Sequence, residues 1–117
     1  MIAIINFACR RISSKELFTC SFNITRTDYL LLVSLLRSGR ERNIVELSSK
    51  LKKERSTIQK SMNRLMKKGL VRRRQMNLDN GGYIFYYSPV EKEEIKSRML
   101  KVINKWFEGV SKNIENL

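Results

Sequence analysis

Apolar side chains recur at intervals of three and four after residue 24, a spacing that predicts helices over 25–38, 44–51, 55–68 and 91–117. The first of these helices begins at Thr25, which forms a capping-box pattern with Asp28, and Gly39 follows its end. Its apolar side chains cover nearly every face, so we expect it to be buried on all sides as the central helix of the fold.

The helices over 44–51 and 55–68 are separated by a short polar turn, Lys52-Lys53-Glu54, of the length found in helix-turn-helix motifs. Asn43, with an acid three residues later, repeats the capping pattern at the start of the first helix. Gly69 suits the left-handed conformation that ends many helices. Both helices place their apolar residues on one side, so each is predicted to bury one face.

A β-hairpin is predicted over 70–88, because β-branched, aromatic and long side chains flank the turn sequence N-L-D-N-G-G. Pro89 is expected to end its second strand. Before residue 25, Ser13 or Ser14 could cap a short helix, and the apolar start could form a helix or a strand that covers the core or a subunit interface.

These elements predict a mainly α, α+β fold in a chain of 117 residues, the size of one small domain. We divide it into an N-terminal extension over 1–24, a helix-turn-helix domain with a two-stranded hairpin over 25–89, and a C-terminal helix over 90–117. The extension is a candidate for part of a dimer interface.

Positive charge is concentrated in the middle of the chain. The net charge is +13, from 24 basic and 11 acidic residues. Between Arg37 and Gln75 there are 14 lysines and arginines against three acids, whereas the remaining residues have 10 against eight. Such clustering indicates a polyanionic partner, because phosphate backbones select basic surfaces of this kind.

The sequence lacks the residues for the usual zinc or histidine chemistry: it has no histidine, and Cys9 and Cys20 do not form a CxxC pair. It also has no glycine-rich nucleotide loop and no evident carboxylate pair, so we expect neither an enzyme nor a metal or cofactor site. The cysteines are most simply reduced cytoplasmic thiols, with a redox-sensing disulfide as the alternative. The apolar start is too short to span a bilayer, and its charges follow it, unlike those of a secretory signal.

The polar side of the helix over 55–68 has the composition of a surface that contacts DNA bases. A major groove admits one helix, and side chains from its first two turns reach the base edges. Gln59 can bond adenine, and Lys60 or Arg64 can bond guanine. An ordinary solvated face is the alternative, but the preceding turn and the following basic hairpin favour DNA. The predicted DNA-binding residues are Lys52, Lys53, Arg55, Ser56, Thr57, Gln59, Lys60, Asn63, Arg64, Lys67, Arg72, Arg74 and Asn80, with Lys50 as a further phosphate contact.

The hairpin arginines alternate between two faces, so Arg72, Arg73 and Arg74 cannot all contact one surface. We expect Arg72 and Arg74 to contact phosphates, while Asn80 and the glycines let the tip approach a minor groove. A charged edge strand protected from aggregation is the alternative. The aromatic residues over 83–87 could stack on single-stranded nucleic acid. We favour a strand with one face packed on the core and the other half exposed, because no second aromatic strand completes a platform.

The apolar stripe of the last helix has three interpretations: intramolecular core, dimerisation helix or membrane-associated helix. Its polar face mixes acids and bases, which disfavours a membrane. The helix is longer than so small a domain needs to cover itself, which favours a homodimer interface with Trp106 and Phe107 as central anchors. The predicted dimerisation residues are Met99, Val102, Ile103, Trp106, Phe107 and Val110.

Together these segments resemble the winged helix-turn-helix transcription regulators, in particular small archaeal proteins of MarR and TrmB-like type. The likeness covers 24–117 and rests on I-T-R-T-D-Y-L-L-L, I-V-E-L-S-S-K-L, E-R-S-T-I-Q-K-S-M-N-R-L-M-K-K-G-L-V and R-R-R-Q-M-N-L-D-N-G-G-Y-I-F-Y-Y. It implies a homodimer on a two-fold DNA site, with recognition helix 55–68 in the major groove and wing 70–88 on the backbone or minor groove.

The resemblance places Ser56, Thr57, Gln59, Lys60 and Arg64 at groove-facing positions. The sequence stops after one long helix, without the sugar-binding domain of full-length TrmB-like regulators or the longer dimerisation region of MarR proteins, so the resemblance does not predict a small-molecule effector. Our hypothesis is a sequence-specific regulator that binds double-stranded DNA, with repression as the simplest mode. The alternative is a winged-helix module for protein–protein or RNA-associated interaction in a larger complex.

Overall fold

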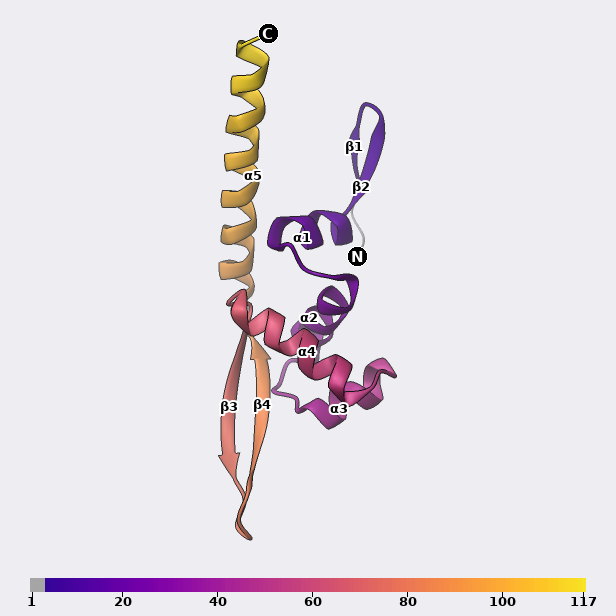
Figure 1. Ribbon diagram of the computed structural model, residues 1–117, viewed down its shortest axis with the longest axis vertical. Coiled ribbons are helices and arrows are strands. Elements are labelled where there is room, and N and C mark those ends of the chain that lie inside the picture. The colour runs from indigo at the N-terminus through magenta and orange to yellow at the C-terminus, as the bar shows by residue number, and fades with distance from the viewer. Residues whose placement is uncertain (1–3) are drawn as a thin grey trace. The chain divides into compact units, whose positions relative to one another are not determined.

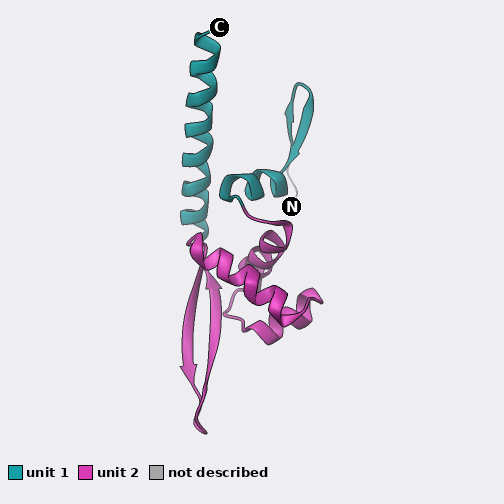
Figure 2. Cartoon of the chain, viewed as in Figure 1, with its two compact units in different colours: residues 1–23, 91–117 teal, residues 24–90 magenta. Residues whose placement is uncertain are grey.

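The computed structural model describes residues 4–117, which fold as two compact units (Figure 2). One unit comprises residues 24–90, and the other combines the N-terminal residues up to Asn23 with residues 91–117. The compact unit over 24–90 nearly coincides with the predicted domain over 25–89. The two flanking segments, far apart in sequence, share the other unit.

The unit over 24–90 contains α2 (Arg26–Ser38), α3 (Ile44–Leu51), α4 (Arg55–Lys67), β3 (Val71–Asn77) and β4 (Tyr83–Pro89) (Figure 1). Helix α4 packs against α2, α3 and β3, and α2 also contacts β4. Every element contributes to one apolar core, and each fully buried side chain of this size adds about 1.5–3 kcal/mol. The buried apolar residues are Leu31, Leu32, Leu35, Leu47, Ile58, Met62, Leu65, Leu70, Val71, Tyr87 and Val90.

Local sequence signals set the helix ends as predicted. The Thr25 hydroxyl accepts from the Asp28 amide at 3.1 Å, and the Asp28 carboxylate accepts from the Thr25 amide at 3.0 Å, which completes the capping box of α2. Asn43 caps α3 by accepting from the Glu46 amide at 2.8 Å. After α4, Gly69 has a φ of 71°, and its amide donates to the Met66 carbonyl at 2.9 Å.

Helix α2 is not buried on all sides, which corrects the expectation from its apolar sequence. Leu31, Leu32 and Leu35 are buried, but Leu30 is 37% exposed and Leu36 is only half-buried. The partners of α2 within this unit, α4 and β4, cover only part of its circumference. An apolar residue on the remaining face stays in contact with solvent, as is common in small domains.

Strands β3 and β4 form the wing, an antiparallel hairpin whose pairing runs from Val71–Pro89 to Asn77–Tyr83. Gly81 and Gly82 make its tip with φ values of 87° and 82°, a left-handed conformation that favours glycine. At the base, the connection between α2 and α3 joins the sheet. The Arg42 amide donates to the Tyr87 carbonyl at 3.0 Å, and the Tyr87 amide donates to the Arg42 carbonyl at 2.8 Å.

The second unit contains β1 (Ile4–Phe7), β2 (Arg10–Ser13), α1 (Ser14–Phe22) and the 24-residue helix α5 (Lys92–Glu115). The Ser13 hydroxyl caps α1 by accepting from the Glu16 amide at 3.1 Å, as the sequence predicted. The β1–β2 hairpin was not predicted as such, and Met1–Ala3 of the apolar start lie outside the described residues. Helix α1 packs against α5.

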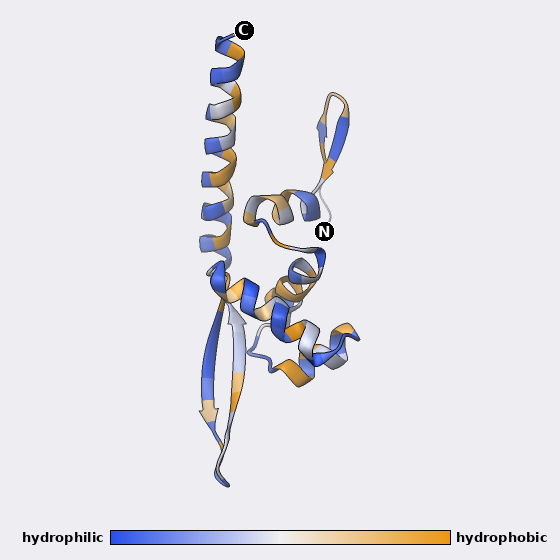
Figure 3. Ribbon diagram, in the orientation of Figure 1, coloured by the Kyte–Doolittle hydropathy of each residue, from blue (hydrophilic) through white to orange (hydrophobic). Residues whose placement is uncertain are grey.

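Hydropathy is distributed differently along helix α5 and strand β3 (Figure 3). Helix α5 alternates hydrophobic and hydrophilic colour along its length, whereas β3 is hydrophilic over most of its length. Cys9 and Cys20 are both exposed and unpaired. Within residues 4–117 no helix has the length and apolar character needed to cross a bilayer.

Candidate nucleic-acid interface

Helices α3 and α4 form a helix-turn-helix whose turn is held by two hydrogen bonds between Ser48 and Lys53. Lys52 ends α3 in the left-handed conformation, with a φ of 55°. The Lys53 amide donates to the Ser48 carbonyl at 3.2 Å, and the Ser48 hydroxyl donates to the Lys53 carbonyl. These bonds tie the turn to the last residues of α3, so the start of α4 has a defined position relative to α3.

Helix α4 has one buried face and one exposed polar face. Ile58, Met62 and Leu65 have no exposed surface, and Ser61 lies buried among the same residues along the helix. The predicted DNA-binding residues that are exposed on α4 are Arg55, Ser56, Thr57, Lys60, Asn63, Arg64 and Lys67, and Lys52 is exposed in the turn before it. The side chains of Lys53 and Gln59 are half-buried.

Two features of α4 suit a phosphate and a base edge, respectively. Glu54 occupies the N-cap without a side-chain capping bond, so the first amide groups of the helix and its positive dipole end are open to an anion. One turn later, Gln59 Nε2 donates to Asn63 Oδ1 at 3.0 Å. This bond orders two amide side chains on the exposed side, where amides can pair with adenine.

Arg64 is drawn toward the core. Its Nε lies 3.1 Å and 3.0 Å from the two carboxylate oxygens of Asp28, and its Nη2 lies 2.9 Å from Oδ1. The Ser61 hydroxyl donates to the same carboxylate. Asp28 has no exposed surface, whereas the Arg64 side chain is 46% exposed. Burial alone would raise the pKa of Asp28, but hydrogen bonds from Arg64 and Ser61 outweigh it and hold this pKa below its ordinary value.

Arg74 of the wing is also paired within the protein. Its Nε lies 2.9 Å and its Nη2 3.0 Å from the carboxylate oxygens of Glu41, in the connection between α2 and α3. Hydrogen bonds from Arg74 lower the pKa of Glu41, and the same pair raises the pKa of Arg74. Because both side chains contact solvent, this pair is screened by water and salt.

Arg73 is a wing residue that is not among the predicted DNA contacts. It shares a face of the hairpin with Val71 and with its cross-strand neighbour Tyr87, both of which are buried, so this face continues the core side of the wing outward. The Arg73 guanidinium lies 4.1 Å from the centre of the Phe85 ring, which orders it while leaving its donors at the edge of the stack. Strand alternation in the sequence already separates Arg73 from Arg72 and Arg74, but it does not show which face carries an aromatic partner.

Arg72 and Arg74 lie on the opposite face of the wing from Arg73, and Asn80 is exposed in the turn. The structure therefore separates the predicted wing residues: Arg74 is bound to Glu41, Arg72 is exposed on the outer face, and Asn80 is at the tip. The aromatic residues pack on the core only at the base of the wing, where Tyr87 is 1% exposed. Tyr83, near the tip, is 59% exposed.

Comparisons with known proteins identify the family. A family model described as the sugar-specific transcriptional regulator TrmB matches residues 19–93, more than half of the chain. The chain belongs to the TrmB family. An uncharacterized protein of Methanocaldococcus jannaschii is 30% identical over 109 residues, which are 93% of this chain and 82% of that protein.

Solved structures are similar to the chain as well. A protein of Methanosarcina mazei, described as a possible transcriptional regulator, has a TM-score of 0.87 at 30% identity. The alignment covers 97% of this chain and 96% of the Methanosarcina chain. A MarR protein from Peptoclostridium difficile has a TM-score of 0.52 at 26% identity. The alignment covers 84% of this chain and 75% of the MarR chain. The fold is a winged helix-turn-helix, and the TrmB-family chain is a transcriptional regulator of this type.

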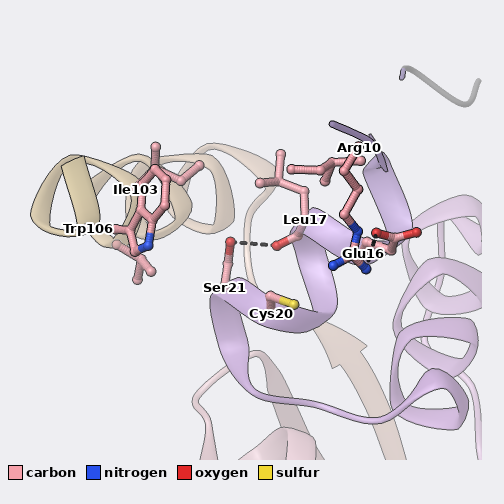
Figure 4. Close-up of a pocket in the computed structure, with 9 residues that line it drawn as sticks. Arg10, Glu16, Leu17, Cys20, Ser21, Ile103 and Trp106 are labelled. Carbon is pink, nitrogen blue, oxygen red and sulfur yellow. Dashed lines mark hydrogen bonds and ion pairs between the residues drawn. The ribbon is translucent and has the colours of Figure 1, made fainter. Parts of the chain in front are cut away.

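The unit that holds α1 and α5 of the TrmB-family chain has a pocket of about 340 Å³ (Figure 4). Leu17 and Cys20 of α1 line one side, and Ile103 and Trp106 of α5 line the other. Ile12 is also part of the lining. The volume lies in the range of small-molecule sites, and its walls are mainly apolar. The polar residues of the lining are Ser21 and the ion pair between Arg10 and Glu16, at 3.6 Å.

The predicted dimerisation residues of the TrmB-family chain fall into two groups. Val102, Ile103 and Trp106 line the pocket, whereas Phe107 lies outside it and is 64% exposed. Met99 and Val110 are half-buried. Two further apolar residues of α5 continue the exposed surface: Leu100 is 60% and Ile114 is 61% exposed. Leu100, Phe107 and Ile114 are seven residues apart, so they form one line along the helix.

Proposed function

We propose that this TrmB-family regulator binds specific sequences of double-stranded DNA as a homodimer. In this proposal α4 enters the major groove, and the wing contacts the flanking backbone and minor groove. The observation that carries the proposal is the exposed polar face of α4, whose opposite face is fully buried. A helix held in this way can present side chains to base edges in a fixed geometry.

Base recognition would fall mainly on the first two turns of α4, with Asn63 at the beginning of the third turn. Ser56 and Thr57 are small enough to let the helix approach the DNA closely, and Lys60 can donate to guanine. Gln59 and Asn63, ordered by their mutual hydrogen bond, are candidates for adenine. Lys52, Lys53, Arg55 and the amides at the start of α4 would bind phosphates and so determine position rather than sequence.

The wing would contribute mainly to affinity. Arg73, stacked on Phe85, is added to the predicted contacts because its position is fixed by the aromatic ring. Arg72 and Asn80 remain candidates for phosphate and minor-groove contacts. The proposed set has a net positive charge that attracts any duplex, which agrees with the clustering of basic residues in the sequence.

A homodimer is supported by the exposed apolar line of α5. Leu100, Phe107 and Ile114 are each more than half exposed, and their seven-residue spacing matches the repeat by which two helices pack along their lengths. A second copy of α5 would bury this line. Two-fold symmetry would then place two recognition helices on half-sites about one helical turn of DNA apart, or a multiple of it.

Selection of bound sequences from a pool of random duplexes tests the whole proposal. The full-length chain should enrich an inverted repeat, because two α4 helices related by a two-fold axis contact the same bases on opposite strands. Phe107→Glu should sediment as a monomer and lose preference for the repeat, while the matched control Lys101→Glu, elsewhere on α5, should remain a dimer. If no sequence is enriched, the alternative of an interaction module for protein or RNA takes precedence.

A further inference from the structure

Arg64 belongs to the predicted base-contacting set, yet its guanidinium is bound to a carboxylate in the core. Two of its nitrogen atoms, Nε and Nη2, are within 3.1 Å of the carboxylate oxygens of Asp28. This is the planar fork geometry in which arginine binds carboxylates most strongly. Asp28 itself has no exposed surface, so water does not compete for this side of the pair.

The Asp28 carboxylate connects the start of α2 with the middle of α4. It accepts from the Thr25 amide at 3.0 Å as part of the capping box, and from Ser61 and Arg64, which are 33 and 36 residues away in sequence. The carboxylate thus has donors from both helices on its two oxygens. Since Ser61 and Arg64 lie three residues apart on α4, they hold that helix at two points on one side.

We propose that Arg64 is a positioning residue, which with Asp28 and Ser61 sets the rotation of α4 about its axis so that Lys60 and its neighbours can contact bases. This inference rests on the proposed DNA-binding function. Arg64 lies in the third turn of α4, beyond the first two turns from which side chains reach the base edges.

The size of the effect follows from helix geometry. A side chain extends about 5–6 Å from the helix axis, so a rotation of about 10° moves its end by roughly 1 Å. A contact with two hydrogen bonds tolerates a displacement of only about 0.5 Å. Loss of the fork to Asp28 would therefore weaken base contacts that Arg64 itself does not make. Arginine has five N–H donors, of which three remain after the fork is formed, so the experiment must also test for a direct base contact.

The test measures affinity of the full-length chain for the duplex selected from the random pool, for every single base-pair variant of it, and for a random-sequence duplex. Arg64→Ala and Arg64→Lys are compared with Asp28→Asn and with the double variant Asp28→Asn/Arg64→Ala. Lys60→Ala is the reference for a residue that contacts a base. Circular dichroism and a thermal melt first establish that each variant is folded at the assay temperature, and Arg64→Lys serves if Asp28→Asn does not fold.

Arg64→Ala should weaken binding to the selected duplex by about tenfold or more, the size of one mismatched base pair. For every base-pair variant of the selected duplex, Arg64→Ala should bind more weakly than the wild-type protein. The affinity for random duplex and its salt dependence should be unchanged. Asp28→Asn should reproduce this loss, and the double variant should be no worse than either single one, because all three remove the same contact. Arg64→Lys should be intermediate, since lysine keeps the charge without the fork.

Three results would overturn the inference. A loss that disappears against one particular base-pair variant, as expected for Lys60→Ala, would make Arg64 a base contact. A log–log salt slope smaller by about 0.9 on random duplex would make it a phosphate contact. Unchanged affinity of a folded Arg64→Ala would remove any positioning role. If the wild-type chain shows no preference among duplexes, the proposed function itself fails, and this outcome is distinct from the other three.

Discussion

Helix α4 and the wing have similar positive charge but different structural support. Four basic residues of α4 are distributed over a helix whose other face is buried at Ile58, Met62 and Leu65. The three consecutive arginines of the wing lie on a hairpin in which residues 72–80 are all exposed. The helix is held by the core, whereas the outer wing is held by its own ladder and by contacts among its side chains.

This difference indicates different tasks for the two regions. Discrimination between bases needs donors and acceptors held within a fraction of an ångström, which a packed helix provides. Attraction to phosphates acts over longer distances and tolerates movement, so an exposed hairpin is sufficient. We therefore expect α4 to determine sequence preference and the wing to contribute mostly to affinity.

In each region one arginine forms an ion pair with a carboxylate of the same chain. Arg64 of α4 is paired with the buried Asp28, and Arg74 of the wing with the half-buried Glu41 at the surface. A count of basic residues therefore overestimates the number of groups available to DNA. The two pairs also allow the same chemical change to be made in a buried and in an exposed environment.

The largest expected effect concerns the support of the two regions. Leu65→Ala should lower the free energy of unfolding by about 2–5 kcal/mol, because it leaves a cavity beneath α4. Met76→Ala in the wing should change it by about 0.5 kcal/mol or less, because Met76 is 39% exposed. Urea denaturation followed by circular dichroism measures both. Equal losses would show that the wing is as tightly packed as the helix.

Acid should affect the buried pair in a defined direction. The pKa of Asp28 is lowered by folding, so its contribution to stability is complete above its ordinary pKa of 3.8 and is lost as pH falls through the lower folded-state pKa. Asp28→Asn should cost about 1–3 kcal/mol at pH 7, as expected for a buried hydrogen-bonded group. The difference from wild type should shrink below pH 4 (about the ordinary value). A difference that stays constant with pH would contradict the assignment.

Lys60→Ala and Arg73→Ala compare recognition with attraction. Lys60→Ala should weaken a specific site by about 1–3 kcal/mol and relax preference at one base pair, with a small effect on random DNA. Arg73→Ala should weaken specific and random duplexes alike and reduce the log–log salt slope by about 0.9. Fluorescence anisotropy at several salt concentrations separates the two patterns. The proposed division of tasks would be reversed if the wing variant changed base preference.

Glu41→Gln should have the smallest effect on stability, because the pair with Arg74 is accessible to solvent and screened. Folding lowers the pKa of Glu41, so the small contribution of this pair is present above the ordinary pKa of 4.5 and lost at lower pH. Release of Arg74 should, however, increase affinity for random duplex at low salt. Weaker binding after the change would mean that Glu41 orients Arg74 for its phosphate.

The parts of this structure that could be predicted from the sequence depend on residues close together in the chain. Thr25 and Asp28, Asn43, and Gly69 act within four positions, and each ends or begins a helix as expected. The exposed face of α4 also followed from helical periodicity alone. The β1–β2 hairpin was missed because its turn, Ala8-Cys9, lacks the asparagine and glycine residues that indicate hairpins.

The partners of the charged residues could not be predicted, because they are chosen by tertiary structure. Asp28 had a sufficient local role as a capping residue, and nothing in its sequence neighbourhood indicated that a second helix would bury it. Glu41 and Arg74 are 33 residues apart and meet only because the connection after α2 lies beside the wing. Helix periodicity assigned Arg64 to the exposed face correctly, but it does not show where a long flexible side chain ends.

The short bridge between Arg42 and Tyr87 gives the wing the mechanics of a cantilever. Two hydrogen bonds of 3.0 Å and 2.8 Å join β4 near its base to the segment that leads into α3, while the glycine tip is exposed and bonded to Leu78 within its own turn. Amide hydrogen exchange should therefore be slower at the buried Tyr87 than at Gly81 and Gly82, because the hydrogen bonds of an exposed turn open more readily. A force that bends the wing at its tip would act through the Arg42–Tyr87 hydrogen bonds on the segment before α3. Bending of the wing would then be coupled to the orientation of α3 and α4.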